Sequence, residues 1–441
     1  MMNQKQRIFF WSITAALGGF LFGFDTAVIS GVEQSLQTLW NLNVWEHGLT
    51  VSIALIGTVL GSMLGGIPAE QLGRKKTLFW IAVLYLVASI GTALAQTWSI
   101  FLVFRFLGGL GVGASSVAAP MYISEISPAK SRGRLVALFQ FNVVLGILIA
   151  YLSNYLLQGI GNDSWRWMLG VQALPSLFFL IAVLNIPESP RWLLLKKGQV
   201  AEALLVLNMI DPETAKTTLI AIQQSNHHTE GSTRLFSASH KMPIILAVLF
   251  AVFNQVSGIN AIIYYAPRIF EMTGLGKSSA LLSSAGIGLV NLIFTLISIN
   301  LIDRYGRRTL MKIGSVGLII TLALVARAFY AQDFGLSVPL LLFAYIAFFG
   351  FSQGAVIWVF ISEIFPNEVR ANGQALGSFT HWLMAAIITF SFPYFAERFG
   401  GGNTFLFFAI MMVLQLVFVL RLMPETKGTS LEQIERTVFA H

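Results

Sequence analysis

The sequence predicts an all-α membrane protein of twelve transmembrane helices, arranged as two six-helix bundles with cytoplasmic linker helices. Three observations predict this class. Hydrophobic residues make up 56% of the 441 residues and charged residues only 11%, against about 25% charged in a soluble domain. The apolar residues form continuous runs of about 20, the length that crosses a bilayer as a helix. Three motifs also recur at nearly one spacing, which indicates two homologous halves.

The composition excludes a soluble enzyme, a nucleic-acid-binding module and a disordered protein. The chain has no cysteine, so disulfides, thiolate catalysis and cysteine-based metal sites are excluded. Among the 6 histidines, only the adjacent pair His227 and His228 has another histidine at metal-ligand spacing. We therefore expect no metal and no cofactor. A Gly-rich ATP-binding loop is also absent, which excludes primary transport.

Twelve apolar segments follow one another, six before a polar stretch and six after it. The first segment follows Lys5 and Arg7, but its run is too long for a signal peptide and no cleavage pattern follows it. The segments of the first half lie near residues 8–31, 49–70, 78–96, 99–124, 135–157 and 166–186. Those of the second half lie near residues 244–267, 280–302, 309–330, 337–362, 373–395 and 403–423.

These segments divide the chain into four expected parts. The first bundle covers residues 1–187, and the second covers residues 244–423. Between them, residues 188–243 are expected to form short amphipathic helices near 199–209 and 213–224, too few residues for a domain with its own core. Residues 424–441 are expected to form a cytoplasmic tail.

Lys and Arg are distributed unequally over the two sides of the predicted membrane. Of the 28 Lys and Arg, 22 fall on the side of the N-terminus, 5 fall on the other side, and Arg105 lies within a span. Loops rich in Lys and Arg remain in the cytoplasm. We therefore expect both termini and the central stretch in the cytoplasm, and we interpret the net charge of +8 as a topology signal rather than a nucleic-acid signal. The compact design suits a bacterial inner membrane.

Three motifs recur between the halves. Residues 123–128 (ISEISP), with Arg132 after them, correspond to 361–366 (ISEIFP), with Arg370 after them, at an offset of 238. Residues 187–189 (PES) correspond to 424–426 (PET) at an offset of 237, and 72–75 (LGRK) to 305–308 (YGRR) at an offset of 233. Parallel repeats of this kind are typical of transporters, whose substrate site lies between the halves near the membrane midplane.

Further motifs point to one family. They are residues 23–31 (GFDTAVISG), 120–125 (PMYISE), 187–192 (PESPRW), 255–261 (QVSGINA) with 264–265 (YY), 303–308 (DRYGRR) and 424–428 (PETKG). With these motifs the chain resembles the sugar porter family of the major facilitator superfamily over essentially its whole length. The resemblance implies the major facilitator fold, alternating access, a monosaccharide substrate (hexose or pentose) and a monomer in the lipid bilayer.

Asp25 and Arg105 are ionisable residues within apolar spans. Each costs roughly 2.5–3.5 kcal/mol at a helix centre. Their positions place both in the outer half of the membrane at comparable depth, where contact between them would offset the cost. A static ion pair is one interpretation. A proton switch, in which protonation of Asp25 frees Arg105, is the other, and the resemblance favours it because proton-coupled members have Asp and Arg in these two spans.

Five neutral amides also lie within apolar spans: Gln140, Asn254, Gln255, Asn260 and Asn291. Amides supply donors and acceptors that suit sugar hydroxyls. A single amide is explained by an interhelical hydrogen bond of about 0.6 kcal/mol, but five at positions matching the family's sugar ligands favour substrate binding. Gln255 and Asn260 lie about 140° apart on a straight helix. A break at Ser257 and Gly258 would let both face one cavity.

The resemblance implies four more residues of the sugar site. Tyr264 matches a ligand or gate position, and Trp358 matches the aromatic platform beneath the sugar, with Gly354 one turn earlier leaving room. His381 stands where relatives have Asn or Gln. It can act as a neutral ligand or, because imidazole titrates near neutral pH, join the proton path. Asn254 stands where many members have a second Gln, so the identity of the sugar stays open.

Charged residues at the cytoplasmic ends of the spans recur in both halves. They either solubilise the helix ends or form inter-helix salt bridges that hold the outward-open state. An exposed ion pair contributes about 0–1 kcal/mol, so this role requires a network. The predicted pairs are Glu125 with Arg132, Glu188 with Arg191, Glu363 with Arg370 and Asp303 with Arg307, together with Arg74.

Proton-coupled monosaccharide symport is the predicted function, with sugar, proton and lipid bilayer as partners and no nucleic acid. A facilitative uniporter of the same fold is the alternative, and Asp25 argues against it. A sugar sensor is remote because only about 18 residues follow the last span, where sensors have long tails. No carboxylate pair, Ser/His/Asp set or metal cluster lies at membrane depth, so we do not expect an enzyme.

Overall fold

The computed structural model describes residues 3–128, 130–225, 235–237, 240–335, 337–366 and 369–427. These residues form helices and no strand. The chain divides into two compact units: Met1–Val28, Ile53–Ala150 and Gly159–Ser232 make the first, and Ile29–Ser52, Tyr151–Gln158 and Thr233–His441 make the second. The predicted part boundaries at residues 187, 243 and 423 stay predictions.

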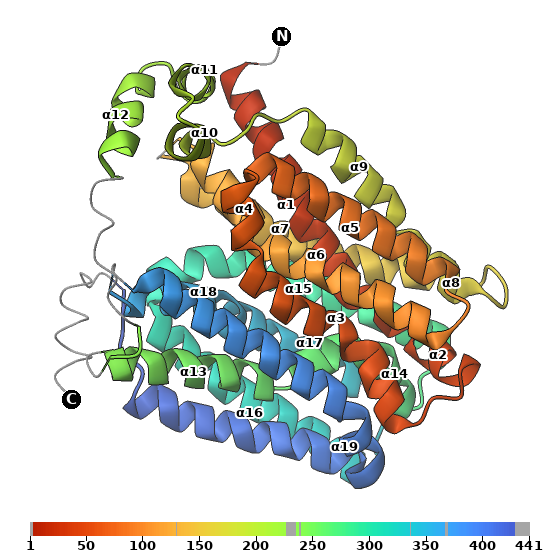
Figure 1. Cartoon of the computed structure of the whole chain (residues 1–441). Coiled ribbons are helices and arrows are strands. Elements are labelled where there is room, and N and C mark those ends of the chain that lie inside the picture. Colours follow the sequence, from red (N-terminus) through yellow and green to blue (C-terminus); the bar gives the residue numbers. More distant parts are fainter. Residues whose placement is uncertain are drawn as a thin grey trace. The chain divides into compact units, whose positions relative to one another are not determined.

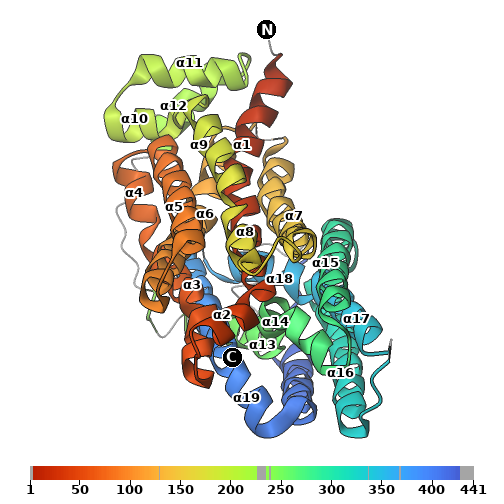
Figure 2. The same cartoon turned by 90° about the vertical axis from the view of Figure 1, so that its right-hand side faces the viewer.

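The first unit is a bundle of helices followed by three short ones. In the bundle, α5 runs beside α6, and both α1 and α9 pack against this pair (Figure 1; Figure 2). Its members are α1 (Gln4–Val28), most of α3 (Val44–Leu64), α4 (Gly66–Gln71), α5 (Arg74–Leu94), α6 (Trp98–Glu125), most of α7 (Arg132–Leu157), α8 (Ser164–Gly170), α9 (Ala173–Leu184), α10 (Pro190–Lys197), α11 (Val200–Ile210) and α12 (Ala215–Ser225).

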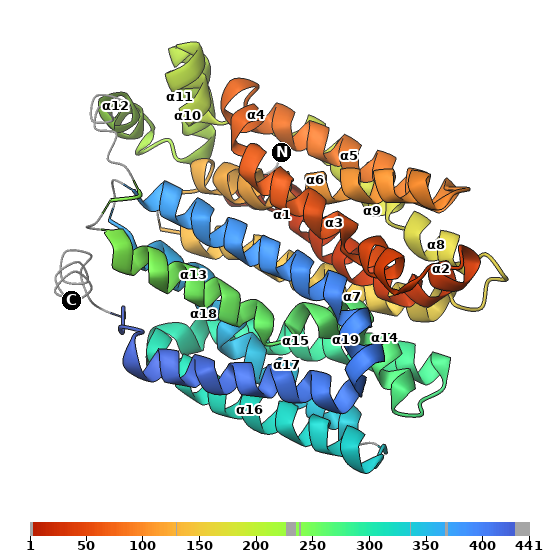
Figure 3. The ribbon, with the colours of Figure 1, turned by 60° about the horizontal axis from the view of Figure 1, so that its bottom comes forward.

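The second unit has its own bundle, in which α19 runs beside both α13 and α16 (Figure 3). Its members are η1 (Ile29–Gly31), α2 (Glu33–Leu39), the first turns of α3, α13 (Lys241–Val256), α14 (Ile259–Met272), α15 (Lys277–Tyr305), α16 (Arg307–Ala331), α17 (Ser337–Phe351), α18 (Gln353–Ile364) and α19 (Arg370–Arg421).

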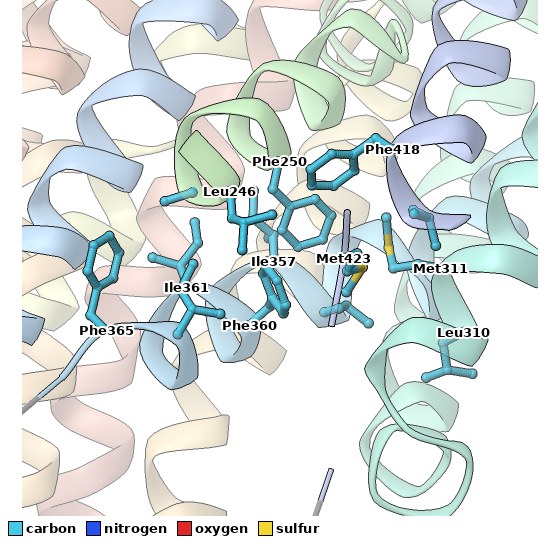
Figure 4. Packing of buried hydrophobic residues seen from close by; sticks show 14 of the residues in the cluster. Leu246, Phe250, Leu310, Met311, Ile357, Phe360, Ile361, Phe365, Phe418 and Met423 are labelled. Atoms are coloured by element: carbon cyan, nitrogen blue, oxygen red, sulfur yellow. The ribbon is translucent and has the colours of Figure 1, made fainter. Parts of the chain in front are cut away.

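The interior of the second unit is packed with large apolar side chains from α13, α18 and α19 (Figure 4). The ring of Phe250 meets that of Phe360 edge-on at a centroid distance of 5.3 Å. It also stacks on Phe418 at 6.4 Å. Edge-on and offset stacked pairs are the favoured aromatic arrangements. This packing fixes α13 and α18, which carry residues of the candidate site.

Among the described residues, eleven helices are long and apolar enough to cross a membrane. The last of them holds two predicted segments, 373–395 and 403–423, because Gly400 (φ 77°, ψ 163°) breaks the helical geometry within α19. The linker contains α11 and α12 near the two predicted helices, and α10 in addition. The predicted fold class is confirmed. Within the predicted linker, residues 226–234, 238 and 239 lie outside the described residues, and so does the predicted tail beyond residue 427.

Close approach of two helices positions the end of α1 that carries Asp25. A Cβ on Gly23 would lie 1.8 Å from the carbonyl oxygen of Val143 on α7. Such a distance is far below van der Waals contact, so only a glycine lets the two backbones approach this closely.

Candidate functional site

The structure brings Asp25 and Arg105 together inside the first unit. Arg105 Nη1 donates to Asp25 Oδ1 at 2.7 Å, and Nη2 donates to the backbone oxygen of Asp25 at 3.3 Å. Asp25 is 5% exposed and Arg105 is 2% exposed. The predicted pairing of these two residues is therefore present, whereas their depth in a membrane stays a prediction. Opposite charges buried at this distance stabilise each other, whereas removal of one partner leaves the other charge uncompensated.

Gln172 also reaches this ion pair and is not among the predicted site residues. The side chain of Gln172, between α8 and α9, forms a hydrogen bond with Asp25. Gln172 is buried. An amide in the middle of the sixth apolar segment was the signal that could have identified it, because buried amides require partners.

A second cluster of polar side chains lies in the second unit, where α13 meets α14. Gln255 Nε2 donates to Asn254 Oδ1 at 2.9 Å, and Asn260 Nδ2 donates to Gln255 Oε1 at 2.6 Å. Gln255 Nε2 also lies 3.2 Å from His381 Nε2. All four side chains are buried. These four residues form a connected set of donors and acceptors, which we call the Gln255 cluster. Such a set can recognise a ring of hydroxyl groups.

The contact between Gln255 and Asn260 depends on a break in the helix. α13 ends at Val256 and α14 begins at Ile259. Between them, Gly258 adopts a left-handed conformation (φ 86°), and Ser257 Oγ donates to the Asn254 carbonyl at 2.6 Å. The predicted break at Ser257 and Gly258 is therefore present, and it turns the two amides toward each other.

We expect Gly258→Ala to lower the thermal unfolding midpoint of the purified protein in detergent. A Cβ at Gly258 would lie 2.6 Å from Phe408 Cδ2, and alanine disfavours the left-handed region, so the cost is about 1–3 kcal/mol. Gly66→Ala is the matched control, because a Cβ at Gly66 would have no atom of the described residues within 4 Å beyond its chain neighbours and its own helix backbone, and alanine favours a helix. Equal midpoints for the two variants would contradict this account of the break.

Aromatic rings surround the imidazole of His381. The Trp358 ring lies 4.9 Å from the His381 ring between centroids, and the Trp382 ring meets His381 edge-on at 4.8 Å. Trp358 is 37% exposed, so part of the indole is open to a ligand while its neighbours are buried. An indole face can cover the C–H groups of a sugar.

The repeated charged motifs form one arginine cluster in each unit, which we call the Arg74 cluster and the Arg307 cluster. In the first, Arg74 binds Glu125 with two hydrogen bonds, from Nε at 2.9 Å and from Nη2 at 3.0 Å. Glu188 accepts from the Arg74 backbone N–H at 2.9 Å, and Ser189 Oγ donates to Glu125 at 2.5 Å. Burial raises the pKa of the Glu188 carboxyl above its ordinary value, although backbone donors from Ser189, Lys75 and Arg74 oppose this effect.

The second unit repeats this arrangement. Arg307 binds Glu363 with Nη2 at 2.7 Å and Nε at 3.1 Å. Glu425 accepts from the Arg307 backbone N–H at 2.9 Å, and Thr426 Oγ1 donates to Glu363 at 2.6 Å. The motif pairs recognised by their sequence offset therefore have equivalent contacts. Bidentate arginine–carboxylate contacts of this kind are strong and directional.

Comparison with known proteins identifies the family. The family described as "Sugar (and other) transporter" matches residues 11–438. The arabinose–proton symporter of Bacillus subtilis (strain 168) is 39% identical over 435 residues, covering 96% of this chain and 94% of the relative. The chain belongs to the sugar porter family of the major facilitator superfamily. It is a multi-pass membrane transporter and not an enzyme.

Two further comparisons agree with the assignment of this chain to the sugar porter family. The D-xylose–proton symporter of Escherichia coli (strain K12) is 35% identical over 481 residues, covering 99% of this chain and 97% of the relative. A partially occluded inward-open structure of the xylose transporter from E. coli has a TM-score of 0.86 at 34% identity. It covers 96% of this chain and 99% of that chain.

The other predicted sugar-site residues of the porter lie on several elements. Tyr264 is buried on α14, Asn291 is half-buried on α15, and Gly354 lies near the start of α18. Gln140 is exposed on α7, in the first unit. Within the described residues, no hydrogen bond joins Asn291 or Gly354 to the Gln255 cluster. Their roles stay predictions.

Several ion pairs of the porter differ from the predicted pairs. Glu125 and Glu363 bind Arg74 and Arg307, not Arg132 and Arg370. Arg132 Nε donates to the Ser124 carbonyl and Arg370 Nε to the Phe365 carbonyl, because carbonyls at a helix end need donors. No ion pair joins Glu188 to Arg191 in the described part of the chain. Asp303 and Arg307 do lie 3.6 Å apart.

Proposed function

We propose that this sugar porter couples the uptake of a monosaccharide to a proton, with Asp25 as the proton acceptor and Arg105 as its partner. The buried Asp25–Arg105 contact at 2.7 Å is the observation that carries this proposal. A carboxylate can bind a proton, and the neutral acid no longer balances the guanidinium. Arg105 would then form hydrogen bonds with other acceptors. Because these acceptors are available in only one of two conformations, protonation would shift the equilibrium between the two. Gln172, the other polar partner of Asp25, can accept or donate in either state.

The Gln255 cluster is the sugar-binding part of the proposal. Asn254, Gln255, Asn260 and His381 offer donors and acceptors from three elements, and the half-open indole of Trp358 offers an apolar face. Gln140, Tyr264, Asn291 and Gly354 are proposed to complete the site. Relatives that transport arabinose and xylose favour a pentose, and a hexose is the other candidate. His381 is proposed to act either as a neutral sugar ligand or as a member of the proton path.

The two arginine clusters are proposed to stabilise the outward-open state from the cytoplasmic side, with both termini in the cytoplasm. Each cluster ties three segments together within its own unit, as Arg74 does for α5, α6 and the residues before α10. A network of this kind exceeds the roughly 0–1 kcal/mol of one exposed pair. It would have to rearrange if the helices moved apart.

Sugar-dependent proton uptake in proteoliposomes tests the proposal. The purified porter is exposed to a panel of pentoses and hexoses, and a lumenal pH dye reports proton entry. We expect acidification with at least one sugar, and accumulation of that sugar under an imposed pH gradient. Equilibration of a sugar without proton flux would instead identify a uniporter, and the Asp25–Arg105 pair would then be structural.

A further inference from the structure

A third group of buried ionisable residues lies away from the proposed transport machinery, where α2 and the first turns of α3 meet α14. It comprises Glu33 on α2, His47 on α3 and Arg268 on α14, all within the second unit. The side chains of Glu33 and His47 are 0% exposed, and that of Arg268 is 29% exposed. We call these three residues the histidine cluster.

One ring nitrogen of His47 faces two opposite partners. His47 Nε2 lies 2.7 Å from Glu33 Oε2 and 3.1 Å from Arg268 Nη1. Arg268 Nη1 is also 3.7 Å from Glu33 Oε2. A protonated Nε2 donates to the carboxylate but opposes the guanidinium. A bare Nε2 accepts from the guanidinium but faces the carboxylate with its lone pair. Neither neutral tautomer of His47 satisfies both contacts.

Three atoms of the histidine cluster add to this imbalance. Within the described part of the chain, Glu33 Oε1, Glu33 Oε2 and His47 Nδ1 are buried and have no hydrogen-bond partner, although Oε2 lies 2.7 Å from His47 Nε2. Buried polar atoms normally have one. The carboxylate of Glu33 therefore has unused capacity for a cation beside it, and a second N–H on the His47 ring would replace no existing bond.

We propose that the histidine cluster is a proton-binding site, and that a proton on His47 releases α14 from α2 and α3. With a neutral His47, the one carboxylate of Glu33 balances the one guanidinium of Arg268. A proton makes the ring a cation that pairs with Glu33 at the existing contact. It also places two positive groups 3.1 Å apart. Arg268, which already reaches solvent, is the group that moves.

Arg268 links α14 to both α2 and α3 through polar contacts. Besides His47, its Nη2 donates to Gln37 Oε1 on α2 at 2.7 Å. The ring of Tyr265, also on α14, meets that of His47 edge-on at 6.1 Å. Repulsion of Arg268 would therefore weaken the attachment of α14 to both α2 and α3. Imidazole is the side chain that changes its charge between about pH 5 and 8.

The other charged groups on the surrounding elements are directed elsewhere or exposed. On α3, the carboxylate of Glu46 accepts from the Asn43 backbone N–H at 2.9 Å. On α14, Tyr265 donates to the Thr389 carbonyl at 3.0 Å. On α19, Tyr394 stacks on Trp45 at 4.6 Å. The remaining titratable groups on α13, α14, α15, α17 and α19 are Lys241, Tyr264, Glu271, Lys277, Asp303, Arg304, Tyr305, Tyr345, Arg370, His381, Glu397, Arg398 and Arg421.

The histidine cluster and the Arg307 cluster lie at opposite ends of the second unit. α14 ends at Met272, α15 begins at Lys277, and α15 then runs to Tyr305 beside Arg307. A helix of 29 residues is about 44 Å long. A proton at the histidine cluster would thus act on the end of the unit remote from the arginine cluster.

Distance measurement between α2 and α14 tests the proposal directly. The chain has no cysteine, so Leu39→Cys and Met272→Cys, both at exposed positions, accept a pair of spin labels without background. Dipolar EPR is recorded between pH 5 and 8. We expect the population of the longer distance to rise at least about threefold toward pH 5, the response of an element poised between two states. His47→Gln, which keeps an N–H donor toward Glu33 but cannot titrate, should abolish this rise.

Two other variants separate protonation from misfolding. Arg268→Gln should also abolish the pH response, because no second cation remains to be repelled. His240→Gln should keep it, because His240 bonds Ser237 and the Leu235 carbonyl outside the histidine cluster. A wild-type distance that does not change with pH, or a response that persists in His47→Gln or Arg268→Gln, would overturn the proposal.

Discussion

Asp25→Asn is expected to abolish sugar accumulation while leaving sugar exchange intact. Asparagine is nearly isosteric with aspartate and still accepts from Arg105, but it cannot bind a proton. One charge moving down 100 mV corresponds to about 2.3 kcal/mol, or roughly 50-fold accumulation of a neutral solute. The variant should therefore fall from tens-fold accumulation to about onefold. Uptake of radiolabelled sugar into energised proteoliposomes measures the ratio, and counterflow measures exchange.

Asp163→Asn is the matched control for this experiment. Asp163 is the same residue type, but its side chain is 73% exposed and lies 3.9 Å from Arg166. An exposed pair at this distance contributes little, so accumulation should remain at the wild-type level. Accumulation by Asp25→Asn at that level would show that the proton is carried elsewhere. Loss of exchange together with accumulation would indicate that the buried pair holds the fold.

The sequence identified the Asp25–Arg105 pair because helix geometry is regular. A rise of 1.5 Å per residue converts position in a span into depth, and two opposite charges at one depth have few other partners in an apolar bundle. The break at Gly258 was also accessible to prediction, since glycine interrupts a helix at low steric cost and two amides five residues apart needed a common face.

The partners of Glu125 and Glu363 were not accessible in the same way. Arg132 and Arg370 lie near these carboxylates in sequence, whereas Arg74 and Arg307 reach them only because the helices carrying them pack side by side. The repeat offset contained this information, since both arginines recur in register. Pairing them required the tertiary arrangement.

The histidine cluster was missed for a different reason. Glu33 and His47 lie at the edges of predicted spans, where charged residues usually face water. In the structure a short helix, α2, turns Glu33 inward, and α14 covers it. No periodicity in the sequence marks so short an element. Burial of the carboxylate is thus a property of the folded unit rather than of its local sequence.

Gln255→Ala is expected to lower the efficiency of sugar transport about 10- to 100-fold. The Gln255 amide bonds Asn254 and Asn260 and lies beside His381, so its removal deletes one sugar ligand and leaves three others without their partner. The loss of one buried polar contact costs about 1–3 kcal/mol, and each 1.4 kcal/mol corresponds to a factor of ten. Counterflow over a range of sugar concentrations measures the change, and it is independent of proton coupling.

Gln415→Ala distinguishes sugar binding from packing. Gln415 is also fully buried, and its Nε2 donates to Ser315 Oγ at 2.8 Å between α19 and α16, outside the Gln255 cluster. This variant should lower the thermal midpoint but keep the apparent sugar affinity within about twofold, because only an interhelical hydrogen bond is lost. If Gln255→Ala behaves in the same way, the amides hold helices together. A loss of apparent sugar affinity that is confined to Gln255→Ala would mean that the helix break at Gly258 presents these amides to the sugar.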